Sequence, residues 1–258
     1  YLRTYGDPIN ASKKCYKELN KQIPENIKIR GLGVTGSGRQ IVGLYSLTEG
    51  VINEITAHAR AAVHFDPEVD TIFEIGGQDA KYTYITNGVP CDYAMNEACS
   101  AGTGSFLEEA SKESLGIDTL DIADMALKST LPPNFSNQCA AFISSDIKNA
   151  IQEGIETEDI IAGLVYSIAM NYINRVKGNR KVGNKIFMQG GVCYNKAVPL
   201  AMASLTGKHI VVPPEPGLMG AFGVALVIKD KLELGLIKPK EFDLKELSNR
   251  QVSYKEPF

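Results

Sequence analysis

Short apolar runs separated by glycine turns follow one another in the middle of the chain. Residues Thr71–Ile75 form such a run, which predicts a strand. Two further strands are predicted at residues 81–86 and 89–95, joined by Asn87-Gly88, the strongest short-range signal for a hairpin turn. The pattern therefore predicts a β-meander that follows the turn Gly76-Gly77-Gln78-Asp79.

Helical periodicity dominates much of the remaining chain. A long helix is predicted at residues 157–177, where apolar side chains recur every three or four positions. Other helices are predicted at residues 9–22, 49–65, 105–115, 118–128, 140–154, 195–205 and 218–234, and other strands at 27–34, 185–188 and 209–212. Strands that alternate with helices after a meander predict an α/β fold with a mixed sheet.

Composition narrows the class of protein. The 258 residues suffice for one large domain or two small ones, and the net charge of −3 with no basic block argues against nucleic acid or an anionic membrane as partner. No apolar run reaches the ~18 residues of a membrane span. Five cysteines without a CxxC motif argue against a disulfide framework and favour a reducing cytoplasm. The first residue is not Met, so we expect a fragment of a longer protein.

Paired glycines after strands are the first candidate for chemistry. In the turn Gly76-Gly77-Gln78-Asp79, backbone N–H groups can point at phosphate oxygens, Asp79 can hold hydrated Mg²⁺, and Lys81 can contact phosphate. Taken alone, the turn is better explained as a tight hairpin between strands. A second pair, Gly190-Gly191, again follows a strand and precedes a helix, which shifts the balance toward a nucleotide cleft.

Two cysteines are the second candidate. Cys99 and Cys139 each lie immediately before a predicted helix, whose N-terminal dipole favours thiolates and an anionic cluster. Taken alone, they are better explained as small buried side chains. We interpret Cys15, Cys91 and Cys193 as structural.

Five motifs occur in a defined order: GGQDAK, NEACSAGTGSFLE, NQCAAFISSDI, MQGGVCYNKAV and PPEPGLMGAFGVAL. In this order they resemble the activators of 2-hydroxyacyl-CoA dehydratases and benzoyl-CoA reductases, which belong to the actin-like, sugar-kinase-like ATPase superfamily. The resemblance covers about residues 31–226. It implies the actin-like, ribonuclease H-like fold with two similar subdomains, which we expect at residues 1–68, truncated at the N-terminus, and 69–258.

The resemblance also implies a function. ATP or ADP with Mg²⁺ binds between the subdomains, and a homodimer shares one [4Fe–4S] cluster across its two-fold axis. ATP use drives a low-potential electron to a dehydratase or reductase partner. The implied cluster ligands are Cys99 and Cys139. The implied nucleotide contacts are Gly76, Gly77, Gln78, Asp79 and Lys81 at the phosphates and Gly190, Gly191, Pro216 and Gly220 at the adenosine. We assign Asp79 the catalytic role of orienting Mg²⁺ and the attacking water.

Two departures from the family pattern accompany the resemblance. The family's first phosphate hairpin would precede Tyr1, and Glu74 stands where the family strand usually carries Asp. The motifs also fit the activase-like half of longer composite proteins. Two alternatives stay open at the level of sequence: a small-molecule kinase of the amino-sugar type, and a non-catalytic assembly module.

Overall fold

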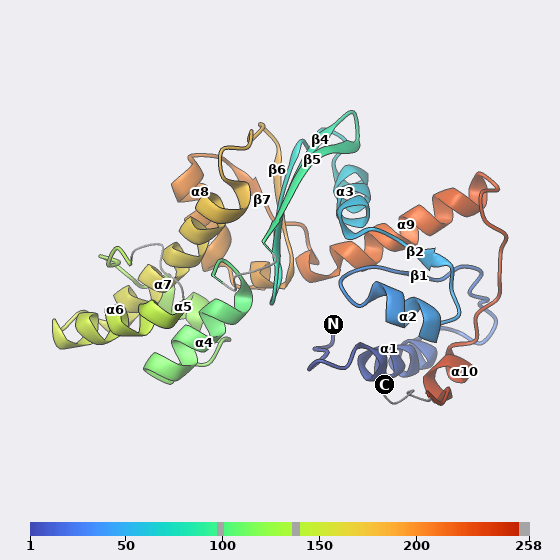
Figure 1. The fold of residues 1–258 in the computed structure, drawn as a ribbon, viewed down its shortest axis with the longest axis horizontal. Helices are drawn as coiled ribbons and strands as arrows, with labels where there is room; N and C mark the ends of the chain where they lie inside the picture. Colours follow the sequence, from blue (N-terminus) through green and yellow to red (C-terminus); the bar gives the residue numbers. More distant parts are fainter. Residues whose placement is uncertain (97–100, 136–139, 253–258) are drawn as a thin grey trace, which may run out of the picture. The chain divides into compact units, whose positions relative to one another are not determined.

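The computed structural model describes residues 1–96, 101–135 and 140–252 (Figure 1). Their contacts divide into two compact units. Unit 1 contains Tyr1–Ala61 and the described residues from Gly220 onward, and unit 2 contains Ala62–Met219. The segment after Gly220 thus groups with the N-terminal residues, whereas the expected boundary after residue 68 placed it with the second subdomain.

A five-stranded mixed sheet forms the centre of unit 2, in the order β5-β4-β3-β6-β7. Its strands are β3 (Thr71–Ile75), β4 (Ala80–Thr86), β5 (Val89–Asn96), β6 (Ile186–Gln189) and β7 (Ile210–Val211). The neighbours β3 and β4, and β4 and β5, pair antiparallel. On the other side of β3, β6 pairs parallel with β3, and β7 pairs parallel with β6. Asn87 and Gly88 have φ angles of 51° and 75°, the left-handed values of the predicted hairpin turn. The predicted meander and mixed sheet are confirmed.

The helices of unit 2 share one buried core with this sheet (Figure 1). They are α4 (Gly104–Leu115), α5 (Ile122–Ala126), α6 (Ala140–Gln152), α7 (Thr157–Asn171) and α8 (Ala197–Thr206), with the 3₁₀ turns η2 (Gly191–Tyr194) and η3 (Pro216–Leu218). The shared core joins sheet and helices through aromatic side chains: Phe73 of β3 and Tyr172 pack edge to face with ring centroids 5.4 Å apart. This core fixes the end of β3, where the first glycine turn begins.

The long helix predicted at residues 157–177 changes its winding near its end. α7 stops at Asn171, and a π-helix, η1, continues over Tyr172–Lys177. The Tyr172 hydroxyl is buried and donates to the Lys81 backbone carbonyl at 2.8 Å. Burial raises the pKa of Tyr172 well above its usual value, so the hydroxyl stays protonated as a donor.

Unit 1 is built mainly from helices. Its elements are α1 (Pro8–Gln22), β1 (Gly33–Val34), α2 (Arg39–Tyr45), β2 (Gly50–Val51), α9 (Met219–Glu233, from Gly220), α10 (Leu244–Asn249) and the part of α3 (Glu54–Phe65) before Ala62. Two predictions here need correction. The strand expected at residues 27–34 is reduced to β1. The helix expected from residue 49 begins at Glu54, because Gly50 and Val51 pair in parallel with Gly33 and Val34.

Close helix contact also shapes unit 1. A Cβ atom on Gly223 of α9 would lie 1.8 Å from the Ala57 backbone oxygen of α3, so this crossing requires glycine. The C-terminal tail, for which no helix was predicted, forms α10, whose N-cap Asp243 accepts from the N–H groups of Lys245 and Glu246. α10 buries Leu244 and Leu247 in one core cluster with Ile9, Tyr16 and Tyr45, which explains why this segment joins the N-terminal residues.

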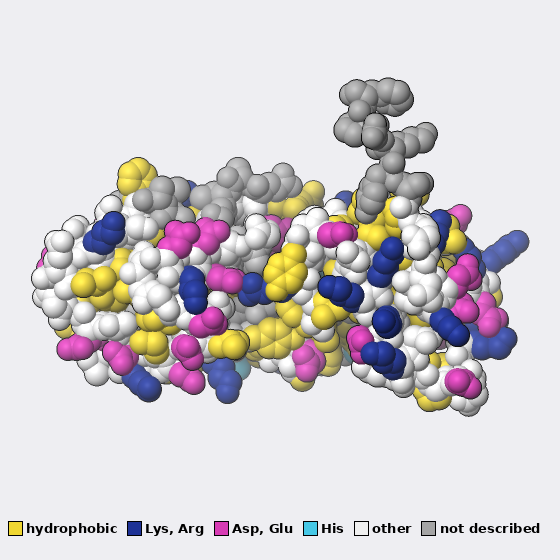
Figure 2. All heavy atoms as spheres, turned by 90° about the horizontal axis from the view of Figure 1, so that it is seen from below, with side chains coloured by type: hydrophobic (Ala, Val, Ile, Leu, Met, Phe, Trp, Pro, Cys, Tyr) yellow, Lys and Arg dark blue, Asp and Glu magenta, His cyan; other side chains and the backbone are white. Residues whose placement is uncertain are grey.

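The surface mixes both signs of charge. Figure 2 shows Lys and Arg side chains interspersed with Asp and Glu side chains over the visible face. Within the described ranges, no helix combines the length and the apolar character needed to cross a bilayer.

Candidate functional site

Two glycine turns leave neighbouring parallel strands at the same edge of the unit 2 sheet. Glu74 of β3 pairs with Gln189 of β6, so Gly76 and Gly190 follow at nearly the same level. Gly190 has φ +98°, and a Cβ atom there would lie 2.2 Å from the Ile75 carbonyl oxygen. Glycine is therefore required for this approach. The carboxyl ends of parallel strands are the usual place for ligands in open α/β sheets.

A hydrogen bond between its own first and last residues closes the first turn. The Gly76 N–H donates to the Asp79 carbonyl at 2.9 Å, and a Cβ atom on Gly76 would lie 3.1 Å from an Asp79 carboxylate oxygen. Gly77 differs, because a Cβ atom there would meet nothing within 4 Å. The backbone at Gly77 is thus open to a ligand, and Gly76 shapes the turn that positions Asp79.

The same turn is tied to the start of α4. The N–H groups of Gly104 and Ser105 donate to the carbonyl oxygens of Gly76 and Gly77, both at 2.9 Å. The Gln78 side-chain amide adds a hydrogen bond to the Ser105 hydroxyl at 2.6 Å. The turn and the first turn of α4 therefore form one hydrogen-bonded unit.

Three charged side chains, those of Glu74, Asp79 and Lys81, form ion pairs next to the first glycine turn. The Lys81 ammonium, with its side chain 2 % exposed, is 3.2 Å from Glu74 Oε2 and 2.7 Å from Asp79 Oδ2. Glu74 and Lys81 face each other because they are register partners across β3 and β4. The Glu74 side chain is 7 % exposed and that of Asp79 is 28 % exposed. Lys81 thus binds two carboxylates, and its predicted phosphate contact stays a prediction.

The second turn is joined to the loop before α9. The Gly190 N–H donates to the Pro216 carbonyl at 2.9 Å, which places η2 beside η3. The structure so brings together three of the predicted adenosine residues, Gly190, Gly191 and Pro216. The fourth, Gly220, belongs to unit 1, where a Cβ atom on it would lie 3.1 Å from His58 Nε2.

The predicted cluster ligands Cys99 and Cys139 lie outside the described residues. The helices that follow them, α4 and α6, pack against each other in unit 2. Of the other cysteines, Cys15 and Cys91 are exposed, while Cys193 is buried behind the second turn and donates to the Gln189 carbonyl at 3.3 Å. Burial raises the pKa of the Cys193 thiol, so this side chain stays neutral.

A match to known proteins accompanies this geometry. Residues 10–227 match the model of the BadF/BadG/BcrA/BcrD ATPase family. The chain belongs to this family. The fold of this family member is the actin-like, sugar-kinase-like ATPase fold, as predicted.

Several relatives of this chain are named as activators of dehydratases. The 2-hydroxyisocaproyl-CoA dehydratase activator of Clostridioides difficile is 35 % identical over 204 residues, 79 % of this chain and 75 % of the relative. The (R)-2-hydroxyglutaryl-CoA dehydratase activating ATPase of Acidaminococcus fermentans is 34 % identical over 195 residues, 74 % of this chain and 72 % of the relative. A solved structure of the activator of the 2-hydroxyisocaproyl-CoA dehydratase from Clostridium difficile with bound ADPNP superposes with a TM-score of 0.78 at 31 % identity, covering 96 % of this chain and 86 % of that chain.

Sequence reasoning missed several contacts in the site of this ATPase. The Glu74–Lys81 pair follows from the four-residue turn between β3 and β4, which fixes their register. Ser105 carried no signal of its own, although its place at a helix start, where N–H groups need acceptors, predicts a contact of this kind. The pair between the Tyr194 hydroxyl and Glu215 Oε2, at 3.0 Å, joins segments that no local pattern connects.

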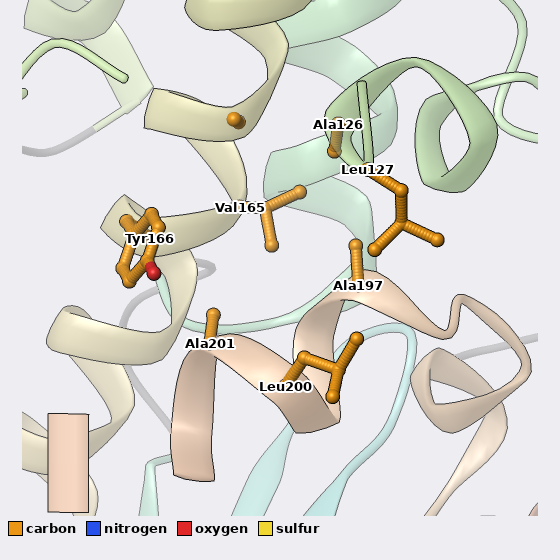
Figure 3. A pocket seen from close by; sticks show the side chains of 8 residues that line it. Ala126, Leu127, Val165, Tyr166, Ala197, Leu200 and Ala201 are labelled. Carbon is orange, nitrogen blue, oxygen red and sulfur yellow. The ribbon is translucent and has the colours of Figure 1, made fainter. Parts of the chain in front are cut away.

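A separate apolar pocket lies between α5, α7 and α8 of this ATPase (Figure 3). Its volume is about 110 Å³. It is lined by Ala126, Leu127, Ala162, Val165, Tyr166, Ala197, Leu200 and Ala201. The Tyr166 hydroxyl is the one polar side-chain group in this lining, so the pocket offers no positive charge to a phosphate.

Proposed function

We propose that this ATPase is an ATP-dependent activator, which passes a low-potential electron to a 2-hydroxyacyl-CoA dehydratase or a related reductase. The proposal rests on the family, on relatives whose names state dehydratase activation, and on a site that suits a nucleotide. The activity belongs in the cytoplasm, where ATP is available.

The residues at the two glycine turns fit a nucleotide. Gly77 offers backbone with open space where a side chain would stand, and Gly190 requires glycine in a left-handed conformation. We assign the first turn, with Gln78, to the phosphates and the second, with Gly191 and Pro216, to the adenosine. A relative with the same fold is solved with bound ADPNP, which supports nucleotide binding by this chain.

Asp79 fits a role beside a hydrated Mg²⁺. Its carboxylate offers the oxygen ligands that Mg²⁺ prefers, and it is the more exposed of the two acids that face Lys81. Lys81 holds that carboxylate in one orientation, and the closed Gly76 turn fixes the backbone beneath it. From there Asp79 can accept a hydrogen bond from the attacking water. We therefore keep Asp79 as the catalytic residue.

Cys99 and Cys139 are proposed to hold a [4Fe–4S] cluster between two copies of the chain. Such a cluster takes four thiolates, and a two-fold dimer supplies two from each copy. When bound, the cluster supplies one-electron chemistry at low potential. The packing of α4 against α6, the two helices that follow these cysteines, supports a shared site for the pair.

The hydrogen bonds between the first glycine turn and α4 carry the proposal. They link the residues assigned to the phosphates, Gly76 and Gly77, with the helix that begins five residues after Cys99. A change in the turn on ATP binding or hydrolysis must move α4 or break these bonds. In each turnover ATP is hydrolysed to ADP and phosphate, one electron passes to the partner enzyme, and a low-potential one-electron donor reduces the protein again.

Parallel assays of ATP hydrolysis and electron transfer test this coupling. Under anaerobic conditions the reduced protein should hydrolyse ATP and transfer electrons to a dehydratase in an ATP-dependent manner. Ser105→Ala, which removes the side-chain link to Gln78, should lower electron transfer per ATP hydrolysed, whereas Ser248→Ala in α10 should leave the ratio unchanged. Sugar-dependent ADP release without electron transfer would instead establish a kinase, and the absence of nucleotide binding would overturn the proposal.

A further inference from the structure

Two polar side chains of α7 are buried without a hydrogen-bond partner among the described residues. They are Ser167, which is 1 % exposed, and Asn171, which is 0 % exposed. Neither the Ser167 hydroxyl nor the two polar atoms of the Asn171 side-chain amide form a hydrogen bond within the ranges that the structure describes. Buried polar groups in folded proteins are nearly always paired, because an unpaired group loses its hydrogen bonds to water. The two side chains therefore indicate a partner outside those ranges.

One face of α7 carries both side chains. Gly163, Ser167 and Asn171 follow one another at intervals of four residues, so they lie on the same side of the helix. At the start of this face, a Cβ atom on Gly163 would lie 2.8 Å from the Phe135 ring. Phe135 is the last described residue before Cys139. The chain thus enters the segment with this cysteine directly from a contact with this face.

The other end of the same face lies beside the segment that follows Cys99. A Cβ atom on Gly102, three residues after Cys99, would lie 3.2 Å from the Tyr172 backbone nitrogen and 3.5 Å from the Asn171 carbonyl carbon. The helix also changes from α to π winding directly after Asn171, and such changes are frequent at functional sites. Described residues close in sequence to each proposed cluster ligand therefore contact the two ends of the face that carries the unpaired side chains.

The chemistry of the two side chains suits sulfur atoms. We propose that Ser167 and Asn171 donate hydrogen bonds to sulfur atoms of the iron–sulfur cluster and thereby tune its reduction potential. The inference rests on the cluster proposed for Cys99 and Cys139. Thiolate and sulfide sulfur atoms only accept hydrogen bonds, whereas a serine hydroxyl and an asparagine amide both donate them. Ser167 and Asn171 are positioning residues around the thiolates, because neither of them is a metal ligand.

The effect of these donors on the reduction potential has a definite sign. Reduction adds a negative charge to the cluster, and hydrogen-bond donors to its sulfur atoms stabilise the more negative state. Burial of Ser167 and Asn171 strengthens this stabilisation, because a buried hydrogen bond acts in a low dielectric. The two side chains therefore raise the reduction potential, so that a weaker electron donor can reduce the protein.

A potentiometric titration of the reconstituted full chain, followed by electron paramagnetic resonance of the reduced cluster, tests this role. Ser167→Ala and Asn171→Leu should each make reduction about fivefold less favourable, which is about 40 mV for a one-electron couple. Ser167→Thr keeps a hydroxyl and should therefore restore most of the wild-type potential. The matched control is Ser111→Ala in α4, because the buried Ser111 hydroxyl already donates to the Glu108 carbonyl at 3.2 Å. This control should leave the potential unchanged.

Iron content and mass in solution, determined for each variant, establish that the cluster is present before its potential is compared. A wild-type potential in both Ser167→Ala and Asn171→Leu would overturn the inference and leave the proposed cluster in place. A shift of the same size in Ser111→Ala would also overturn it, because the effect would then come from packing alone. A wild type that binds no iron would overturn the proposed cluster together with the inference.

Discussion

Replacing Lys81 with methionine removes the positive charge that lies between two carboxylates. The Glu74–Lys81 pair has lost almost all contact with water, since the two side chains are 7 % and 2 % exposed. Removing one partner of such a pair costs about 3–5 kcal/mol, because the remaining charge stays buried. The Asp79 side chain is 28 % exposed and can be hydrated once Lys81 is removed, so losing the Lys81–Asp79 pair should cost only about 0–1 kcal/mol. We therefore expect Lys81→Met to lower the free energy of unfolding by about 3–5 kcal/mol.

A second substitution should restore part of this loss. In Glu74→Gln alone, the Lys81 ammonium keeps its ion pair with Asp79 Oδ2 at 2.7 Å, so the free energy of unfolding should fall by only about 1–2 kcal/mol. In the double variant no buried charge remains at position 74, and the protein should be more stable than Lys81→Met. The exposed pair between Lys112 and Asp118 in the same unit, 3.8 Å apart, provides the control. Lys112→Met should cost less than about 1 kcal/mol.

Urea unfolding followed by far-ultraviolet circular dichroism measures these differences, provided that the slope with urea does not change between variants. Hydrogen exchange of β3 and β4 peptides reports the same loss locally in unit 2. A cost for Lys81→Met below about 1 kcal/mol would contradict a buried ion pair, because an exposed pair is worth that little. So would a double variant whose loss equals the sum of the two single losses.

Two further predictions concern a turn and a loop. Gly190→Ala should lower the free energy of unfolding in urea by about 3 kcal/mol, because its Cβ atom would lie 2.2 Å from the Ile75 carbonyl oxygen. The control Gly207→Ala should lower it by about 1 kcal/mol, because Gly207 is left-handed but has open space around it. Equal losses in the two variants would contradict the steric argument. Hydrogen bonds from the Ser129 hydroxyl and from loop N–H groups hold the pKa of the Asp159 carboxyl below its usual 3.8. The stability that Asp159 contributes should therefore be complete above pH 3.8 and lost as the pH falls below this value. Thermal melts of Asp159→Asn should lack this acid-dependent loss of stability. If the variant lost stability with acid as the wild type does, Asp159 would not be the source of the loss.

Local signals in the sequence predicted the part of the sheet that carries the first turn. The apolar run over Thr71–Ile75 and the Asn87-Gly88 hairpin signal depend on neighbours in sequence, and both are confirmed. Pairing between distant segments carries no such signal. The helical pattern predicts a helix over Gly50–Val51, but these residues form β2 because they pair with the distant strand β1. The charged tail gives no clear helical pattern, although it forms the capped helix α10.

In the candidate site, too, features set by neighbouring residues were predictable, and contacts between distant segments were not. Glycine pairs after strands identified both turns, because a close backbone approach needs glycine wherever it occurs. The packing that links Gly190 to Pro216 could not be predicted, since it depends on β6 and β7 lying side by side. The buried ion pair of Lys81 was predictable in part. Its register with Glu74 follows from the turn length, but its near-complete burial follows from how the sheet is covered.

We propose that two copies of this ATPase share one iron–sulfur cluster through Cys99 and Cys139. We would reconstitute the protein anaerobically with iron and sulfide, then determine iron content together with mass in solution for the wild type, Cys99→Ser and the control Cys15→Ser. We expect about four irons per dimer in the wild type and in Cys15→Ser, and loss of iron in Cys99→Ser. A colourless wild type that stays monomeric, or iron retained in Cys99→Ser, would contradict it.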